Sequence, residues 1–221
     1  MTRTDAGRIR DAERTQEAVL VAAEDCFARL GFEGTSVKQI AESAGVARST
    51  PAYFFGSKDA LYDAVLERVV TRGQQAMARA YAEAADGRSS EDAVDSYVAA
   101  LLDFLGNDRN FLRLIQREAL GDGSRVTAFF ALAVDEAVAV LRPAAQGAGI
   151  SPERLILDLA ALCWYPFAHE HTLLPALGID ARDPSFIAEQ KRHLGEFVRA
   201  MAQASQPSAS SPPEARRRYG S

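Results

Sequence analysis

The chain has 221 residues, of which 48% are hydrophobic and 25% charged, so it can bury a substantial core as an ordinary globular protein. Its net charge of −5 and pI of about 5.3 exclude a generally basic surface that would attract polyanions. The most apolar run, residues 155–168, is interrupted by Asp158 and is too short to cross a bilayer. Two distant cysteines, Cys26 and Cys163, do not make a disulfide framework, so we expect a protein of the reducing cytoplasm with no membrane partner.

In chain order, every predicted element is a helix. Apolar residues recur at helical spacing, and no run alternates apolar and polar residues as a half-buried strand would. The fold class is therefore all-α, with about nine helices. We expect them near residues 11–30, 36–44, 47–54, 58–84, 91–105, 108–120, 124–146, 152–178 and 184–204.

Glycine, serine and proline mark the ends of these helices. Gly31 should close the first helix, because glycine readily adopts the left-handed conformation of a C-cap. Ser36 should open the second helix as a capping box with Gln39, three residues later. Pro152 and Pro184 fall in first turns, where the missing N–H is harmless.

The segment 35–58 has the spacing of a helix-turn-helix, a motif whose second helix enters the major groove of DNA. Ala41 is small enough for two helices to cross closely. Gly45, four positions later, suits the positive φ of the turn, and Val46 supplies the next buried apolar residue. The motif makes a DNA-binding function the leading interpretation.

Around this motif, many residues agree in order and spacing with a known pattern: Phe27, Gly31, Phe32, Thr35, Ile40, Ala41, Ala44, Gly45, Val46, Tyr53, Phe55, Lys58 and Leu61. In these residues the chain resembles the DNA-binding domain of the TetR family of bacterial transcriptional regulators. The resemblance covers roughly residues 15–66, and beyond residue 70 it is limited to the number and length of the helices.

The resemblance implies a division of the chain into three parts. Residues 1–57 would form a helix-turn-helix DNA-binding domain of three helices, completed by the start of a long fourth. Residues 58–204 would form a helical ligand-binding and dimerisation domain. The tail, residues 205–221, is rich in Ser and Pro and is expected to be disordered.

The resemblance also assigns roles to single residues of the first domain. Ala47, Arg48 and Ser49 would start the recognition helix, where Arg48 could grip guanine O6 and N7 for about 1–3 kcal/mol of discrimination. Thr50 and Tyr53 would hold phosphates, which set register rather than sequence. The predicted DNA-binding set is completed by Ser36, Lys38 and Lys58.

The chain departs from the family pattern at Pro51-Ala52, where the usual residues are Leu-Tyr. Proline is tolerated in a first helical turn, so the helix can persist, but a phosphate-binding tyrosine is lost. Alternatives stay open for several residues. The aromatic run 53–55 could belong only to the core, Ser36 and Lys58 could merely cap helices, and the motif could contact protein instead of DNA.

A dimer interface is expected at the end of the chain. The segment 155–168 is apolar nearly all round, and the last helix has an apolar stripe, so the two resemble the four-helix dimer interface of the family. The predicted interface residues are Phe167, Leu194, Phe197, Val198 and Met201. The alternative is a stripe that packs within one protomer.

Aromatic residues concentrate in the middle of the chain, where family members bind an effector. We predict an apolar cavity for a small apolar or amphipathic molecule. Its predicted lining is Phe104, Phe129, Phe130, Trp164 and His169. Each of these residues could instead be ordinary core.

Other chemistries find little support in the sequence. His169 and His171 would point about 200° apart on a helix, so a shared metal ion is not expected, and no cofactor is implied. Cys163 could sense oxidants, although a small buried apolar role fits better. Arg216–Arg218 could touch phosphates but belongs to the tail.

Taken together, the sequence predicts a homodimeric regulator, a repressor, that binds a palindromic operator and is released by its effector. One alternative is a DNA-binding regulator without an effector. The other is an all-helical binding protein or enzyme, which lacks any nucleophile–base pair, paired carboxylates or phosphate loop in its support.

Overall fold

The computed structural model describes residues 3–85 and 89–204, apart from the side chains of a few positions within these ranges. This described chain is all-α, as the sequence predicts, and none of its helices is long and apolar enough to cross a membrane. The predicted tail with Arg216–Arg218 lies outside it. The helices are α1 (Arg3–Gly34), α2 (Val37–Ala44), α3 (Thr50–Phe55), α4 (Lys58–Ala85), α5 (Ser90–Asn107), α6 (Arg109–Ala119), α7 (Ser124–Gly147), α8 (Pro152–Ala168), α9 (Leu173–Ala176) and α10 (Pro184–Ala204).

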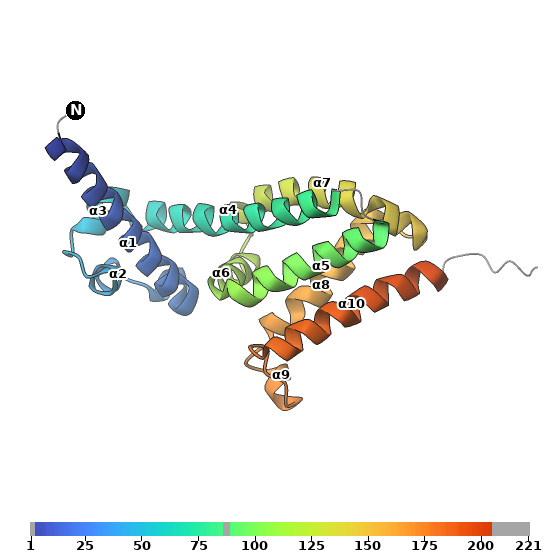
Figure 1. The fold of residues 1–221 in the computed structure, drawn as a ribbon. Coiled ribbons are helices and arrows are strands. Elements are labelled where there is room, and N and C mark those ends of the chain that lie inside the picture. The colour runs from blue at the N-terminus through green and yellow to red at the C-terminus, as the bar shows by residue number, and fades with distance from the viewer. Residues whose placement is uncertain (1–2, 86–88, 205–221) are drawn as a thin grey trace, which may run out of the picture.

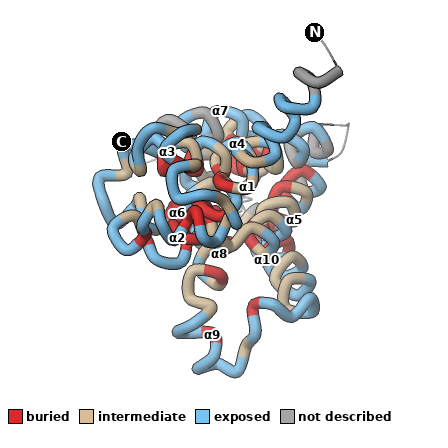
Figure 2. Tube along the Cα trace, turned by 90° about the vertical axis from the view of Figure 1, so that its left-hand side faces the viewer, coloured by how far each residue is buried: buried red, intermediate tan, exposed pale blue. Residues whose placement is uncertain are grey.

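Helices α1, α2 and α3 gather at one end of the molecule and will be called the head (Figure 1). Helix α4 leads away from the head into the body, which comprises α4 to α10. Within the body α4 packs along α5 and α7, α8 packs on the same two helices, and α10 lies against α5. Helix α6 contacts both α1 and α4, so it joins the head to the body (Figure 1). Buried segments lie where these helices face one another, whereas the chain around α9 is mostly exposed or half buried (Figure 2).

The head is built around one aromatic cluster. Phe27 of α1 is fully buried and meets the ring of Tyr62 of α4 edge to face, with ring centroids 4.9 Å apart. Gly31 has φ 76°, so the helical path of α1 breaks there, as expected. The hydroxyl of Thr35 closes the break, because its oxygen lies 2.7 Å from the carbonyl oxygen of Gly31 and 3.1 Å from that of Cys26.

Three helix boundaries differ clearly from the sequence prediction, and proline accounts for one of them. Helix α1 begins at Arg3 rather than near residue 11. Helix α3 begins at Thr50 rather than at residue 47, so residues 47–49 form a turn in front of it. Pro51 has no N–H to donate to the carbonyl of Ala47, as a helix from residue 47 would require. The helix expected over 152–178 ends at Ala168, and only the four-residue α9 follows it. The helical path ends because His169 leaves the helical conformation, with φ −111° and ψ 21°.

A cluster of charged side chains ties the head to the body. The guanidinium of Arg72 on α4 donates two hydrogen bonds, of 2.8 and 2.9 Å, to the carboxylate of Glu24 on α1. Its Nε also donates to Asp108, between α5 and α6, over 2.8 Å. Burial disfavours the charged guanidinium, but these hydrogen bonds outweigh it and raise the pKa of Arg72. Arg68 approaches the same Glu24 carboxylate at 3.3 Å and pairs with Glu17 at 2.6 Å.

The two cysteines are buried and unpaired in the described structure. Cys163 lies fully buried on α8, and burial raises the pKa of its thiol to about 12. The reactive thiolate is therefore scarce near neutral pH. The interpretation of Cys163 as a small apolar core residue is the one that the structure supports.

The Glu24–Arg72 contact should contribute strongly to the stability of the fold. Arg72→Leu should lower the free energy of unfolding by about 2–3 kcal/mol, because it leaves the nearly buried Glu24 carboxylate without its bidentate partner. Urea unfolding followed by circular dichroism measures the change. Arg29→Leu is the control, because Arg29 pairs with Asp25 on the exposed face of α1. It should cost less than about 0.5 kcal/mol. Equal effects of the two substitutions would contradict the role given to Arg72.

Candidate DNA-binding surface and apolar cavity

The turn between α2 and α3 is formed as the sequence predicts. The Ser36 hydroxyl accepts from the backbone N–H of Gln39, and the Gln39 side chain accepts from the N–H of Ser36, which is the complete capping box. Gly45 has φ 67° and closes α2, and the N–H of Val46 donates to the carbonyl of Ala41 over 3.0 Å. Because Ile40 and Ala41 are buried, α2 is held firmly beneath the turn.

Arg48 lies exposed in the turn just before α3. Within the described residues, its guanidinium has neither an ion-pair partner nor a hydrogen bond. Its neighbours Ala47 and Ser49 are also exposed, and Thr50 is half buried. The long donor expected to read a base is therefore free to reach outward from the head.

Pro51 of α3 is buried, whereas Tyr53 is 83% exposed. This exposure rules out a core-only role for Tyr53. Its ring meets only the edge of Phe54, with centroids 5.1 Å apart, and the hydroxyl projects from the head. Phe55, by contrast, is half buried and packs against the core. The aromatic run thus divides into one surface residue, Tyr53, and two half-buried residues, Phe54 and Phe55.

The two predicted lysines have different surroundings. The ammonium of Lys38 lies 3.6 Å from the Glu42 carboxylate in an exposed pair one turn further along α2. The ammonium of Lys58, at the start of α4, stands 4.3 Å from the centroid of the Phe32 ring. Lys58 therefore has a structural contact, and it stays half exposed at the end of the body nearest α3. The end of the molecule that holds α2 and α3 is largely exposed (Figure 2).

An apolar cavity of about 130 Å³ lies inside the body, enclosed by α4, α5, α6, α7 and α8. Three predicted residues, Phe104, Phe130 and Trp164, line it. Phe129 lies in α7, but its side chain is outside the described part of the chain.

His169 is not among the residues that line the cavity. Five residues separate it from Trp164, which places the two about 140° apart around a helix. His169 lies beyond the end of α8, where its ring meets that of Tyr165 at a tilt of 37°, with ring centroids 4.2 Å apart.

The sequence analysis missed other residues that line the cavity. Phe111 of α6 is part of the cavity wall, and its ring contacts those of Phe104 and Trp164. Met77 also lines it. The sequence could have predicted that Met77 is buried, because it follows Val69 by eight residues, two steps of four along the same face of α4.

The residues predicted for a dimer interface fall into two groups. Phe167, Leu194 and Val198 are buried within the protomer, because the inner stripes of α8 and α10 pack into its core. Their side chains are not available to a partner. Phe197 is 40% exposed, and Met201 is half buried. The outward side of α8 also exposes large apolar side chains that the prediction missed, namely Leu157, Leu162 and Tyr165.

Metal ligands are not gathered in the described structure, where no group of three or more His, Cys, Asp or Glu residues could hold an ion. The Glu170 carboxylate lies between Arg109, Arg113 and His171. It serves as an ion-pair partner for cations.

Comparisons with known proteins agree with this geometry. Residues 19–65 match the family described as bacterial regulatory proteins, tetR family, and residues 91–198 match the tetracyclin repressor-like C-terminal domain. The HTH-type transcriptional repressor NicS of Pseudomonas putida is 31% identical over 207 residues, which cover 89% of this chain and 96% of NicS. The HTH-type transcriptional regulator RutR of Escherichia coli K12 is 44% identical over 68 residues, covering 31% of this chain and 32% of RutR.

A solved structure shares the fold. The transcriptional regulator FadR of Bacillus subtilis, in complex with stearoyl-CoA, superposes with a TM-score of 0.63 at 14% identity and covers 82% of this chain and 96% of FadR. The helix-turn-helix of the head, the helical body and the similarity to a named repressor over nearly its full length all point to the same family. The chain belongs to the TetR family of bacterial transcriptional regulators, and is a DNA-binding regulator rather than an enzyme.

Proposed function

We propose that the chain is a cytoplasmic homodimeric repressor that binds a palindromic operator and leaves it when a small apolar or amphipathic effector enters the cavity of the body. One observation carries this proposal. Helix α4 starts beside the DNA-reading turn at Lys58 and lines the apolar cavity further along at Gly73 and Met77. A single rigid element therefore touches both sites. The repressor named NicS, similar over nearly its whole length, supports the direction of regulation.

DNA reading would rest on placement rather than on total charge. Residues 1–60 carry eight Lys or Arg and nine Asp or Glu, so the head as a whole does not attract phosphate. Arg48 would grip a guanine edge in the major groove, while Thr50 and Tyr53 hold the backbone. Ser36 and Lys38 of α2, with Lys58, would add phosphate contacts. Ala47 and Ser49, which lie in the turn just before α3, would bring that turn close to the bases.

A dimer would bring two such heads to one operator. The exposed apolar side chains of α8 and α10 lie on adjacent surfaces, since the Gln190 side chain donates to the carbonyl of Leu162 over 3.4 Å. We propose that Phe197, Met201 and the outward residues of α8 pack against their copies around a twofold axis. Twofold symmetry suits two recognition segments that must sit about 34–36 Å apart on the DNA.

The cavity limits the effector that can bind without rearrangement. Its 130 Å³ is close to the roughly 150 Å³ of an apolar cavity that holds benzene. A larger molecule would have to part α7 or α8 from α4, and the displacement would move the start of α4 with the head. Such coupling between effector and DNA is typically worth about 1–3 kcal/mol. The stearoyl-CoA in FadR shows only that this fold can hold an amphipathic molecule.

Operator binding tests the DNA-reading role directly. Arg48→Ala should weaken binding to the specific operator by about 5–150-fold, because about 1–3 kcal/mol of base discrimination is lost. Gel-shift titration against the DNA upstream of the protein's own gene measures the effect. Arg14→Ala serves as the control, because Arg14 is an exposed arginine of α1 that pairs with Asp11. No specific shift by the unmodified protein, or equal binding by both variants, would defeat the regulator proposal in this form.

Self-association tests the dimer surface. Phe197→Glu should convert the dimer to a monomer at micromolar concentration, because a carboxylate would be buried against its own copy. Sedimentation velocity measures the mass. Leu120→Glu is the matched control, since Leu120 is an exposed apolar residue at the far end of α6. The dimer surface is wrong if both variants sediment as the unmodified protein does.

Cavity occupancy tests the effector site. The chain has a single tryptophan, Trp164, and it lines the cavity, so its emission reports on binding there. Toluene should change this emission saturably, and Ala160→Phe should abolish the change by filling the cavity while leaving operator binding intact. Ala119→Phe, exposed at the end of α6, should respond as the unmodified protein does. A response that persists in Ala160→Phe would place the probe elsewhere.

A further inference from the structure

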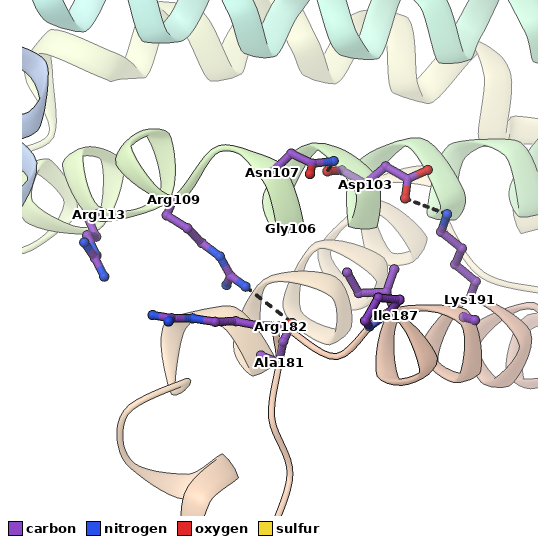
Figure 3. Close-up of a pocket in the computed structure, with 11 residues that line it drawn as sticks. Asp103, Gly106, Asn107, Arg109, Arg113, Ala181, Arg182, Ile187 and Lys191 are labelled. Atoms are coloured by element: carbon purple, nitrogen blue, oxygen red, sulfur yellow. Dashed lines mark hydrogen bonds and ion pairs between the residues drawn. The ribbon is translucent and has the colours of Figure 1, made fainter. Parts of the chain in front are cut away.

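A second hollow, of about 710 Å³, lies between the corner of α5 and α6 and the first turns of α10 (Figure 3). Its volume falls within the roughly 300–1,000 Å³ of small-molecule sites. It is separate from the apolar cavity, with which it shares no lining residue. Cationic side chains dominate its polar lining, namely Arg109, Arg113, Arg182 and Lys191.

The positive charge on one wall of this hollow is incompletely balanced. Arg109 and Arg113, one turn apart on α6, share the single carboxylate of Glu170, at 3.1 and 3.4 Å. The Glu170 side chain is only 7% exposed, and His171 also approaches it, at 3.3 Å. Arg182 extends from the loop before α10 toward the two arginines of α6 (Figure 3). In the described part of the chain its guanidinium has no ion-pair partner. Three guanidinium groups thus face one carboxylate.

Two neighbouring acids do not correct this balance. Asp103 is already paired with Lys191 over 2.6 Å at the opposite end of the hollow (Figure 3). The carboxylate of Asp180 accepts the backbone N–H of Arg182, which holds it in its own loop, and it does not line the hollow. The wall of arginines therefore keeps an excess of positive charge.

Arg109 shows the consequence at atomic scale. Its Nη1 is buried and makes no hydrogen bond, because the approach of Glu170 lacks hydrogen-bond geometry. Its Nη2 donates to the carbonyl of Ala181 over a long 3.3 Å. Burial, with repulsion from Arg182 and Arg113, lowers the pKa of Arg109 despite the attraction of Glu170 and, more weakly, of Asp180. An anion in the hollow would offset the repulsion among the guanidinium groups.

We propose that this hollow binds a small organic oxyanion, a carboxylate or a phosphate ester. The planar guanidinium groups of Arg109, Arg113 and Arg182 match the paired oxygens of either group. The first turns of α10 give the hollow an apolar part, formed by Pro184, Ile187 and Ala188, with Lys191 at its far end. It would receive the carbon part of the ligand. This arrangement of a cationic wall opposite an apolar wall distinguishes the site from a simple ion pair between helices.

The hollow shares no lining residue with the surface proposed for the dimer. Occupancy of the hollow can therefore be measured in the dimeric protein. The inference stands independently of the DNA-binding and effector proposals, because its readout is binding of an anion alone.

Thermal unfolding of the full chain with added ligand tests this site. Phenyl phosphate and benzoate are the two probes, and benzyl alcohol and sodium chloride at equal ionic strength are the reference additives. We expect the unfolding midpoint to rise saturably with at least one of the anions and with neither reference additive. Stabilisation by one anion alone identifies the preferred class, and stabilisation by both identifies a general oxyanion site.

Matched variants locate the effect. Arg182→Gln should weaken anion binding about tenfold or more, because a charge-assisted contact is lost, while raising the midpoint without ligand slightly, because its repulsion of Arg109 is removed. Arg192→Gln is the control, since Arg192 lies on α10 outside this hollow and pairs with exposed glutamates. Ala188→Glu, on the rim, should block binding by repulsion. Absence of anion stabilisation, or equal stabilisation in Arg182→Gln and Arg192→Gln, would overturn the proposal.

Discussion

The structure depends on one carboxylate, that of Glu24, which fixes where the head stands on the body. It lies on α1 and is contacted by Arg72 and Arg68 of α4, and by the side-chain amide of Asn110 on α6 at 3.4 Å. Arg72 extends the connection to Asp108, which also caps the first turn of α6 by accepting from the N–H of Phe111. Because charged groups need these partners once water is removed, the three helices cannot shift independently without leaving one of them unpaired.

This arrangement explains how a head with no net positive charge can serve as a DNA-reading unit. Long-range attraction would pull a basic domain to any phosphate, whereas under the proposed function this head would rely on the position of a few groups. Position is useful only if the head is held rigidly, and the Glu24 contacts provide that rigidity. In the proposed mechanism, the same contacts would carry a displacement of α4 to the turn before α3.

The parts of the fold that sequence could predict are those set by neighbours in the chain. The capping box of Ser36, the left-handed Gly45 and the periodic apolar stripes depend on residues a few positions apart, and all occur in the structure. The sequence shows Pro51 near the start of the predicted helix. That α3 begins only at Thr50 follows from the hydrogen bond that Pro51 cannot donate to the carbonyl of Ala47. The burial of Phe167, Leu194 and Val198 depends on which helices become neighbours, and an apolar stripe alone cannot separate a protomer core from a partner. The Glu24 cluster and the hollow beside Arg182 unite residues more than forty positions apart, so no local pattern announces them.

The break in α1 at Gly31 has a consequence for exchanging heads among relatives. Arg117 of α6 reaches across from the body and donates to the carbonyls of Ala28 and Arg29, over 3.3 and 3.0 Å, at the end of the helical part of α1. Its guanidinium occupies the space beside Gly31, where an added Cβ would come within 2.8 Å of Nη1. Gly31 of the head and Arg117 of the body therefore form one contact in which each residue requires the other. A chimera that joins this head to another body keeps this contact only if that body carries an arginine at the same place on α6.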